Sequence, residues 1–93
     1  MYCVYILASR RHGTLYIGVA NSLQTRLEQD RSGSGSEFVK AHGVYRLVCV
    51  ESFDRPDEAI VREKQLKRWK RAWKIEMIRR EDLEWRDLSD LLV

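Results

Sequence analysis

The chain has little of what secreted, fibrous and membrane proteins need. Its 93 residues include two cysteines, one proline and five glycines, too few for a disulfide framework or a fibrous repeat. No apolar run approaches the roughly 18 to 20 residues of a membrane span. The basic residues of the N-terminal MYCVYILASRR follow its apolar run, the reverse of a signal peptide. These absences predict a cytoplasmic protein without a membrane anchor.

The composition that remains is typical of one small globular domain. Hydrophobic residues make up 44% of the chain and charged residues 33%, as in ordinary folded proteins. A chain of this length buries only about 60 to 65% of its unfolded surface on folding. We therefore expect a single domain over residues 1–93 with one modest core. Cys3 and Cys49 lie in apolar runs, and both are expected to be free thiols.

Positive charge is concentrated in one segment of the chain. The net charge is +3, but residues 62–74 are strongly basic and contain a single acid, Glu63, while the tail after Arg80 is largely acidic. Such a local concentration favours polyanion binding, because each phosphate that is neutralised releases counterions. A solvated helix face is the alternative. The candidate nucleic-acid-binding residues are Lys64, Lys67, Arg68, Lys70, Arg71 and Lys74.

Three segments have the pattern of β-strands. The apolar run YCVYILAS at 2–9 is typical of a strand covered on both faces. RRHG then forms a turn, and TLYIGV at 14–19 completes an antiparallel hairpin. A third strand is predicted at 45–53, in YRLVCVESF. The sheet is therefore expected to be three-stranded and largely antiparallel.

Helical patterns occupy the segments between and after these strands. A first helix is predicted between the second strand and the Ser/Gly-rich SGSGS, a second from DRPDEA to about Lys67 or Lys70, and a third over 71–81. EFVKAHG at 37–43 is expected to be a turn, and 83–93 a short terminal helix. The result is an α/β (α+β) fold in the order ββα, β, αα, with three or more helices around the sheet.

The tryptophans of the third predicted helix follow a regular spacing. Trp69, Trp73 and Met77 recur every four residues, which places them on one side of a helix. We expect this stripe to face the core, and base stacking is the alternative role.

Two tyrosines and a glycine stand out in the predicted hairpin. Tyr5 and Tyr16 lie on neighbouring strands, where aromatic cross-strand pairs add stability. A phenol beside a cation gives up its proton more readily and can serve as a general base. Gly18, inside a predicted strand, suggests a bulge or a close approach of the backbone. Packing alone would also explain each of these residues.

Two charged residues lie beside apolar helix positions. Glu63 is near the edge of the stripe that Leu66 continues, and a carboxylate there needs an arginine, a lysine or a metal ion beside it. A structural salt bridge is the simplest such arrangement. Arg26 is flanked by Leu23 and Leu27 and is followed four residues later by Asp30, so an ordinary i,i+4 ion pair would account for it.

Taken together, these segments resemble the GIY-YIG nuclease family. The resemblance rests on CVYIL, LYIGVANSLQTRL and EAIVREKQLKRWKRAWKIEMI, and it is closest to the small single-domain bacterial members. YIG is intact at Tyr16, Ile17 and Gly18. CVY stands at the family's first triplet, so that Cys3 and Val4 replace its glycine and isoleucine while Tyr5 keeps its tyrosine.

The resemblance implies a reaction and a role for each matching residue. It implies a metal-dependent endonuclease that hydrolyses phosphodiester bonds in DNA, as in repair or recombination, and leaves a 5′-phosphate and a 3′-hydroxyl. Glu63 would bind one Mg²⁺ or Mn²⁺ ion, and Arg26 would stabilise charge on the phosphate. The base role falls jointly to Tyr5 and Tyr16, with Tyr16 favoured. The basic segment would hold the DNA backbone.

One position departs from the family pattern. Four residues after the helix arginine the family usually has a histidine or a tyrosine, whereas this chain has Asp30. An ionised aspartate repels phosphate and can pair with Arg26; a role as an extra metal ligand is a lesser alternative. His42 is a candidate replacement for the missing imidazole. The alternative function is therefore a catalytically impaired module that still binds nucleic acid.

No segment resembles an element that reads bases. A module of this size has little surface for sequence specificity. A partner protein, or the structure of the DNA itself, is expected to supply the specificity.

Overall fold

Seven helices and strands make up the parts of the chain that the computed structural model describes, residues 2–31, 37–81, 85 and 88. The strands are β1 (Tyr2–Ala8), β2 (Leu15–Ala20) and β3 (Arg46–Phe53). The helices are α1 (Leu23–Arg31), α2 (Glu37–His42), α3 (Pro56–Arg68) and α4 (Arg71–Glu81). The predicted strands and the three longer helices are confirmed. The turn predicted at 37–43 is wrong, because α2 occupies most of it.

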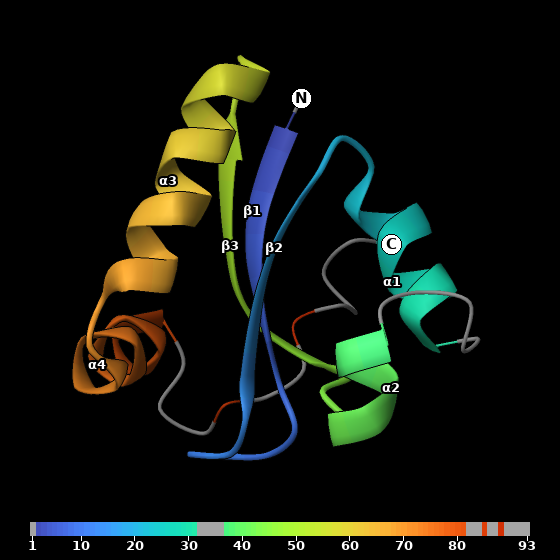
Figure 1. The fold of residues 1–93 in the computed structure, drawn as a ribbon, viewed down its shortest axis with the longest axis vertical. Coiled ribbons are helices and arrows are strands. Elements are labelled where there is room, and N and C mark those ends of the chain that lie inside the picture. The colour runs from blue at the N-terminus through green and yellow to red at the C-terminus, as the bar shows by residue number, and fades with distance from the viewer. Residues whose placement is uncertain (1, 32–36, 82–84, 86–87, 89–93) are drawn as a thin grey trace.

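The three strands form one antiparallel sheet in the order β2-β1-β3, with β1 at its centre (Figure 1). Residues Val4 to Ala8 of β1 are all buried, as expected for an apolar strand that is covered on both faces. The pairing of β1 with β3 shifts in register between Ile6 and Leu7. The predicted three-stranded antiparallel sheet is thereby confirmed.

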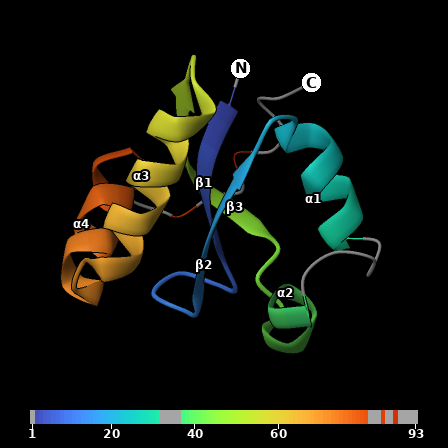
Figure 2. The same cartoon turned by 45° about the horizontal axis from the view of Figure 1, so that its top comes forward.

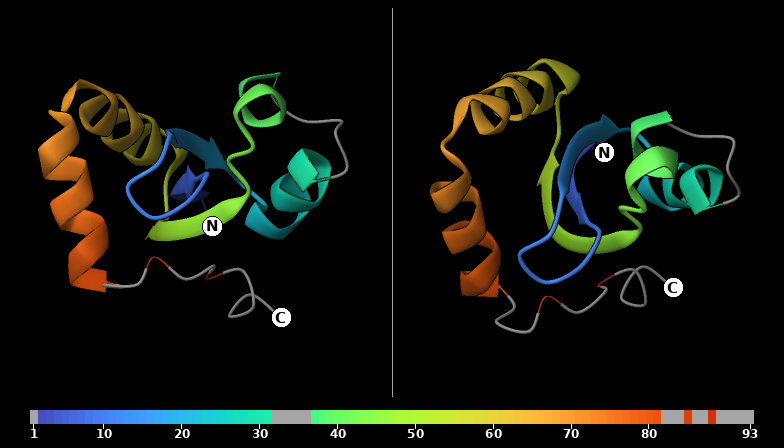
Figure 3. Two further views of the ribbon diagram at one scale, coloured as in Figure 1. Left: turned by 90° about the horizontal axis from the view of Figure 1, so that it is seen from below. Right: turned by 60° about the horizontal axis from the view of Figure 1, so that its bottom comes forward.

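Helices cover both faces of this sheet. α3 and α4 lie on one side, and α1 and α2 lie on the other, in every view (Figures 2 and 3). The two faces differ because successive residues of a strand point in opposite directions. None of the helices within the described ranges is long and apolar enough to cross a bilayer.

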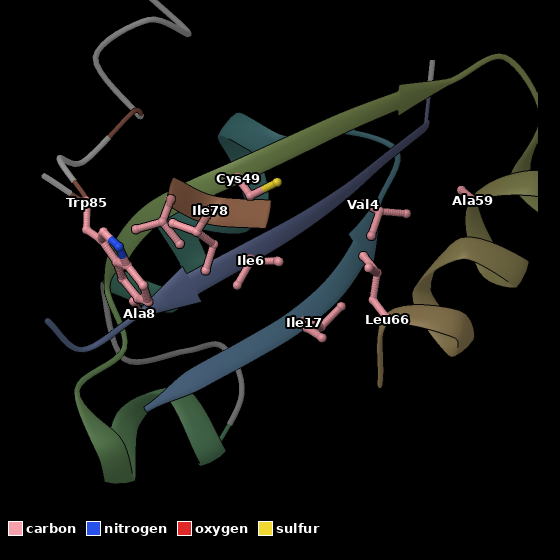
Figure 4. Close-up of a cluster of buried hydrophobic side chains, with 10 residues drawn as sticks. Val4, Ile6, Ala8, Ile17, Cys49, Ala59, Leu66, Ile78 and Trp85 are labelled. Carbon is pink, nitrogen blue, oxygen red and sulfur yellow. The ribbon is translucent and has the colours of Figure 1, made fainter. Parts of the chain in front are cut away.

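One buried core lies between the sheet and the α3 and α4 side. Val4 and Ile6 of β1 and Ile17 of β2 meet Leu66 of α3 and Ile78 of α4 (Figure 4). A second buried cluster lies on the face covered by α1 and α2. It contains Tyr5, Leu7, Leu23, Leu27, Val39, Val44 and Leu47. The alternation along β1 thus divides its side chains between two cores.

The predicted tryptophan stripe is wrong at one of its three positions. Trp73 is 54% exposed, whereas Trp69 and Met77 are half-buried. The rings of Trp69 and Trp73 meet edge to face, with their centroids 6.1 Å apart. α4 instead turns Ile78 into the core, which carries Trp73 away from it. Most of the terminal helix predicted at 83–93 lies outside the described residues.

An ion pair that the sequence did not predict joins α3 to β3. Arg62 donates from Nε to Glu51 Oε1 at 2.7 Å and from Nη2 to Glu51 Oε2 at 3.0 Å. The Arg62 guanidinium also lies over the Trp69 ring, 5.0 Å from its centroid. Hydrogen bonding to Glu51 raises the pKa of Arg62. Arg62, which belongs to the basic run, is therefore committed to holding the fold.

Glu51→Ala is expected to lower the free energy of unfolding by about 1 to 3 kcal/mol, because the half-buried guanidinium of Arg62 would lose its charged partner. Urea denaturation followed by tryptophan fluorescence measures this change. Glu28→Ala removes the same charge from an exposed position on α1 and should change the value by less than about 0.5 kcal/mol. Equal effects of the two variants would show that the ion pair contributes nothing.

Candidate active site

Tyr5 and Gly18 lie opposite each other on β1 and β2. Directly opposite residues of an antiparallel pair point to the same face of the sheet. A Cβ at Gly18 would lie 2.6 Å from the hydroxyl oxygen of Tyr5 and 2.7 Å from its Cζ, which is closer than atoms can pack. The glycine therefore makes room for the fully buried Tyr5 side chain to lie across β2.

Tyr16 lies next to Tyr5 on the same face. The centroids of the two rings are 6.4 Å apart, with an angle of 49° between the ring planes, which is within the range of favourable aromatic contacts. Tyr16 is half-buried at the margin of the cluster that contains Tyr5. The two tyrosines that the sequence singled out are therefore neighbours, and Tyr16 is the more accessible one.

Arg26 belongs to the helix that covers this face. Its neighbours Leu23 and Leu27 are buried in the same cluster as Tyr5, which fixes the orientation of α1 against the sheet. Arg26 is half-buried, and its Nε atom is inaccessible to solvent. A partly desolvated guanidinium is a stronger electrostatic partner for an anion than a fully hydrated one. α1 thus brings a cation to the tyrosine side of the sheet.

Glu63 lies on the other side of the sheet from Arg26. It lies on α3, between Ala59 and Leu66, which are both buried in the opposite core. Its side chain is only 17% exposed and accepts an ion pair from Lys67 Nζ at 2.9 Å. This i,i+4 pair is the structural salt bridge that the sequence offered as the simplest arrangement. α3 packs against β1 and β2, so Glu63 is on the helix that flanks the edge strand.

The structure thus divides the predicted catalytic residues into two groups. Tyr5, Tyr16 and Gly18 are in contact, and Arg26 is on the helix that covers them, whereas Glu63 is on the helix of the opposite face. The two helices lie on either side of β2 (Figure 1). Because β2 is an edge strand, its free edge is where side chains from α1 and α3 can approach one substrate.

Glu63 offers only a limited set of ligands to a metal ion. Among the described residues, no three His, Cys, Asp or Glu side chains are grouped so that they could hold one. A half-buried single carboxylate fits a hard divalent cation that keeps several waters and also binds substrate phosphate. The Lys67 ammonium, 2.9 Å from Glu63 Oε1, would have to move aside for such an ion.

Two further positions of the predicted site are placed only in part. Asp30 lies in α1, but its side chain is outside the described part of the chain. His42 is exposed at the end of α2. SGSGS, the segment between α1 and α2, is also outside the described residues, so the predicted role of His42 stays a prediction.

The predicted nucleic-acid-binding residues surround the junction between α3 and α4. Lys64, Lys67, Arg68, Lys70 and Arg71 are exposed, and Lys74 is half-buried. Several of these cations have contacts within the protein. The Lys70 ammonium lies 5.7 Å from the centroid of the Trp73 ring. Arg71 Nη2 donates to the carbonyls of His12 at 2.8 Å and Gly13 at 2.5 Å.

Comparison with known families identifies the family of the chain. Residues 1–76 match the model of the GIY-YIG catalytic domain, and this range contains all four predicted catalytic residues. The chain belongs to the GIY-YIG family. Membership places it in a nuclease-like superfamily and implies a nucleic-acid substrate.

Bacterial proteins of similar size are related to this GIY-YIG chain. UPF0213 protein SSP2268 of Staphylococcus saprophyticus is 32% identical over 75 residues, covering 81% of this chain and 90% of that protein. UPF0213 protein OB0043 of Oceanobacillus iheyensis is 31% identical over 81 residues, covering 87% and 93%.

A solved structure has a similar fold. It is the solution NMR structure of UPF0213 protein BH0048 from Bacillus halodurans, with a TM-score of 0.52 and 29% identity. The similarity covers 84% of this chain and 83% of that one. The predicted GIY-YIG-like fold and the resemblance to small bacterial members of the family are thereby confirmed.

Gly18→Ala is expected to destabilise the protein by about 1 to 3 kcal/mol, because the new methyl group would overlap the Tyr5 ring. Urea denaturation of Gly18→Ala, of Tyr5→Ala and of the double variant measures the coupling between the two sites. We expect the cost of Gly18→Ala to fall sharply when Tyr5 is already alanine.

Gly43→Asn is the control for the Gly18 experiment. A Cβ at Gly43 meets no atom within 4 Å, and asparagine tolerates its positive φ. This variant should therefore cost less than Gly18→Ala. Strictly additive effects of Gly18→Ala and Tyr5→Ala would contradict a direct contact between the two side chains.

Proposed function

We propose that this GIY-YIG domain is a metal-dependent endonuclease that hydrolyses phosphodiester bonds in DNA. The observation that carries the proposal is the packing of Tyr16 against Tyr5 over Gly18, on the face covered by the helix of Arg26. This arrangement supplies a proton acceptor and a cation on one side of an edge strand. Both are needed where a phosphodiester is cleaved.

The difference in burial between the two tyrosines favours Tyr16 as the general base. Tyr5 is fully buried and Tyr16 is half-buried, so only the Tyr16 phenol is readily reached by water and DNA. As a phenolate, its oxygen takes a proton from the attacking water while the water oxygen bonds to phosphorus. The bond from phosphorus to the 3′ oxygen then breaks, and that oxygen takes up a proton from solvent. Tyr5 orients the Tyr16 ring through their contact.

Arg26 and Glu63 have the two electrostatic roles. The Arg26 guanidinium donates hydrogen bonds to the phosphoryl oxygens, on which negative charge grows as water attacks. Glu63 is the residue that would hold one Mg²⁺ or Mn²⁺ ion, which supplies neutralisation of charge at the phosphate and the leaving oxygen. The Lys67 ammonium orients the Glu63 carboxylate until such an ion and the substrate arrive.

DNA is the substrate that we favour. The exposed cations on α3 and α4 suit a continuous phosphate backbone, which they contact without reading sequence. A role in repair or recombination would follow if a DNA structure or a partner protein supplied the specificity. The products would carry a 5′-phosphate and a 3′-hydroxyl.

Nicking of supercoiled plasmid in Mg²⁺ or Mn²⁺ tests this proposal. We expect Tyr16→Phe to lower the rate by about 100-fold or more, because a phenylalanine cannot accept the proton. Arg26→Ala should lower it by about 100-fold to 1,000-fold, and Glu63→Gln should abolish the metal-stimulated nicking, because it removes the carboxylate that would hold the ion. Tyr5→Phe should have the smallest effect of the four variants.

Two matched variants are controls for this assay. Tyr2→Phe removes a hydroxyl from a half-buried tyrosine on the opposite face, and Glu28→Gln neutralises an exposed carboxylate. Both should nick like the wild type. Nicking at the wild-type rate in both Glu63→Gln and Arg26→Ala would contradict the proposal.

The second candidate function is DNA binding without cleavage, which Asp30 favours as a departure from the family pattern. A carboxylate four residues after Arg26 can occupy the guanidinium and repel the phosphate. Asp30→His is then expected to raise the nicking rate at least several-fold, as measured in the same plasmid assay. A wild type that nicks rapidly, together with a slower Asp30→His variant, would rule out the impaired module.

A further inference from the structure

A hollow lies between the turn that joins β1 to β2 and the beginning of α4. It has a volume of about 470 Å³, and its lining includes Arg10, His12, Gly13, Arg71 and Lys74. We call it the turn hollow. α4 and this turn lie at the same end of the molecule (Figure 1). Leu15 lines the turn hollow and packs against the core on the α3 and α4 side, whereas Tyr16, the next residue of β2, packs against the cluster on the other face.

The lining of the turn hollow is positively charged. Among the described residues, two arginines, a lysine and a histidine contribute to it, and no carboxylate does. Neither Arg10 nor Lys74 forms an ion pair with any residue that the structure describes. Other cations of the two helices do pair with acids: Arg62 with Glu51, Lys67 with Glu63 and Arg79 with Glu76. Within the described ranges the positive charges of Arg10 and Lys74 are thus not balanced by a paired acid.

Arg71 fixes the geometry of the turn hollow. Its Nη2 donates to the carbonyls of His12 and Gly13, which ties α4 to a turn almost sixty residues earlier in the chain. Those carbonyl oxygens, which would otherwise repel an anion, are satisfied by this contact. Within the described part of the chain Arg71 forms no other hydrogen bond, so its Nε and Nη1 groups can donate to a ligand. A rigid guanidinium with donors to spare suits phosphate.

We infer that the turn hollow binds a backbone phosphate of the nucleic acid, away from the bond that is cut. The inference rests on the proposed nucleic-acid substrate and adds a contact that includes Arg10, outside the basic run. Leu15, which lines the turn hollow, directly precedes Tyr16 on β2, and the two side chains pack on opposite faces of the sheet.

Fluorescence anisotropy tests the turn hollow without any cleavage. The probe is a fluorescein-labelled DNA duplex of about 20 base pairs, measured in EDTA over a series of salt concentrations. The double variant Arg10→Gln/Lys74→Gln should bind about tenfold more weakly at low salt. The slope of log K against log salt should fall by about 0.9, the value for one lost phosphate contact. Arg71 is left intact because it also anchors the turn.

The matched control is Lys40→Gln/Arg55→Gln, which removes the same two charges from exposed positions on α2 and beside α3. It should keep the wild-type slope. Thermal unfolding of both double variants should match that of the wild type. In the described ranges neither Arg10 nor Lys74 pairs with an acid, and the Arg55–Asp57 pair of the control is exposed, where an ion pair contributes little. A variant of the turn hollow with the wild-type slope, or a control that loses as much, overturns the inference.

The remaining outcomes separate this inference from the proposed function. A wild type that binds the duplex through the turn hollow but does not nick plasmid would support the inference and refute the nuclease. If the wild type nicks plasmid and the double variant Arg10→Gln/Lys74→Gln keeps the wild-type salt slope, the nuclease is supported and the inference is refuted. A wild type that binds no duplex in EDTA at low salt would overturn the inference.

Inorganic phosphate at constant ionic strength distinguishes a free ion from a backbone phosphate. We expect it to displace the duplex only at tens of millimolar. Saturable binding of phosphate below about 1 mM, without displacement by duplex, would assign the turn hollow to a free ion and overturn the inference.

Discussion

The close approach of Tyr5 to Gly18 is the constraint on which the rest of the structure depends. β1 is buried on both faces, so each of its side chains must find room in one of two cores. The Tyr5 ring finds room because the opposite residue on β2 has no Cβ. The same contact places Tyr16 beside Tyr5 and leaves it half-exposed at the margin of the core. Packing and chemistry are therefore set by one pair of residues.

The cations of the molecule fall into two groups, those with contacts inside the fold and those left at the surface. The guanidinium of Arg62 is held by Glu51 between α3 and β3, and Lys67 holds Glu63. Nη2 of Arg71 donates to two carbonyl groups of the turn between β1 and β2. These cations stabilise the arrangement of the helices, while other cations at the surface are available to bind a polyanion. A count of basic residues along the chain does not make this distinction.

Local patterns predicted most of the fold. The continuous apolar run of β1, the β-forming residues of β2 and the helical patterns of α1 and α3 are properties of short segments, so the sequence shows them directly. The helix α2 was missed because six residues carry too short a pattern to tell a helix from a turn. The spacing of Trp69, Trp73 and Met77 predicted a shared side of a helix, but not which neighbour covers it, and Trp73 is exposed.

The sequence by itself determined the strands, the longer helices and, through the family resemblance, the identity of the candidate catalytic residues. Only the tertiary structure decided their arrangement: Tyr5, Tyr16 and the helix of Arg26 on one face, and Glu63 on the helix of the other. It also joined Arg10 to Arg71 and Lys74 around one hollow. The physical reason is that these relations link residues far apart in the chain. They are set by the packing of whole helices against the sheet, which no local pattern encodes.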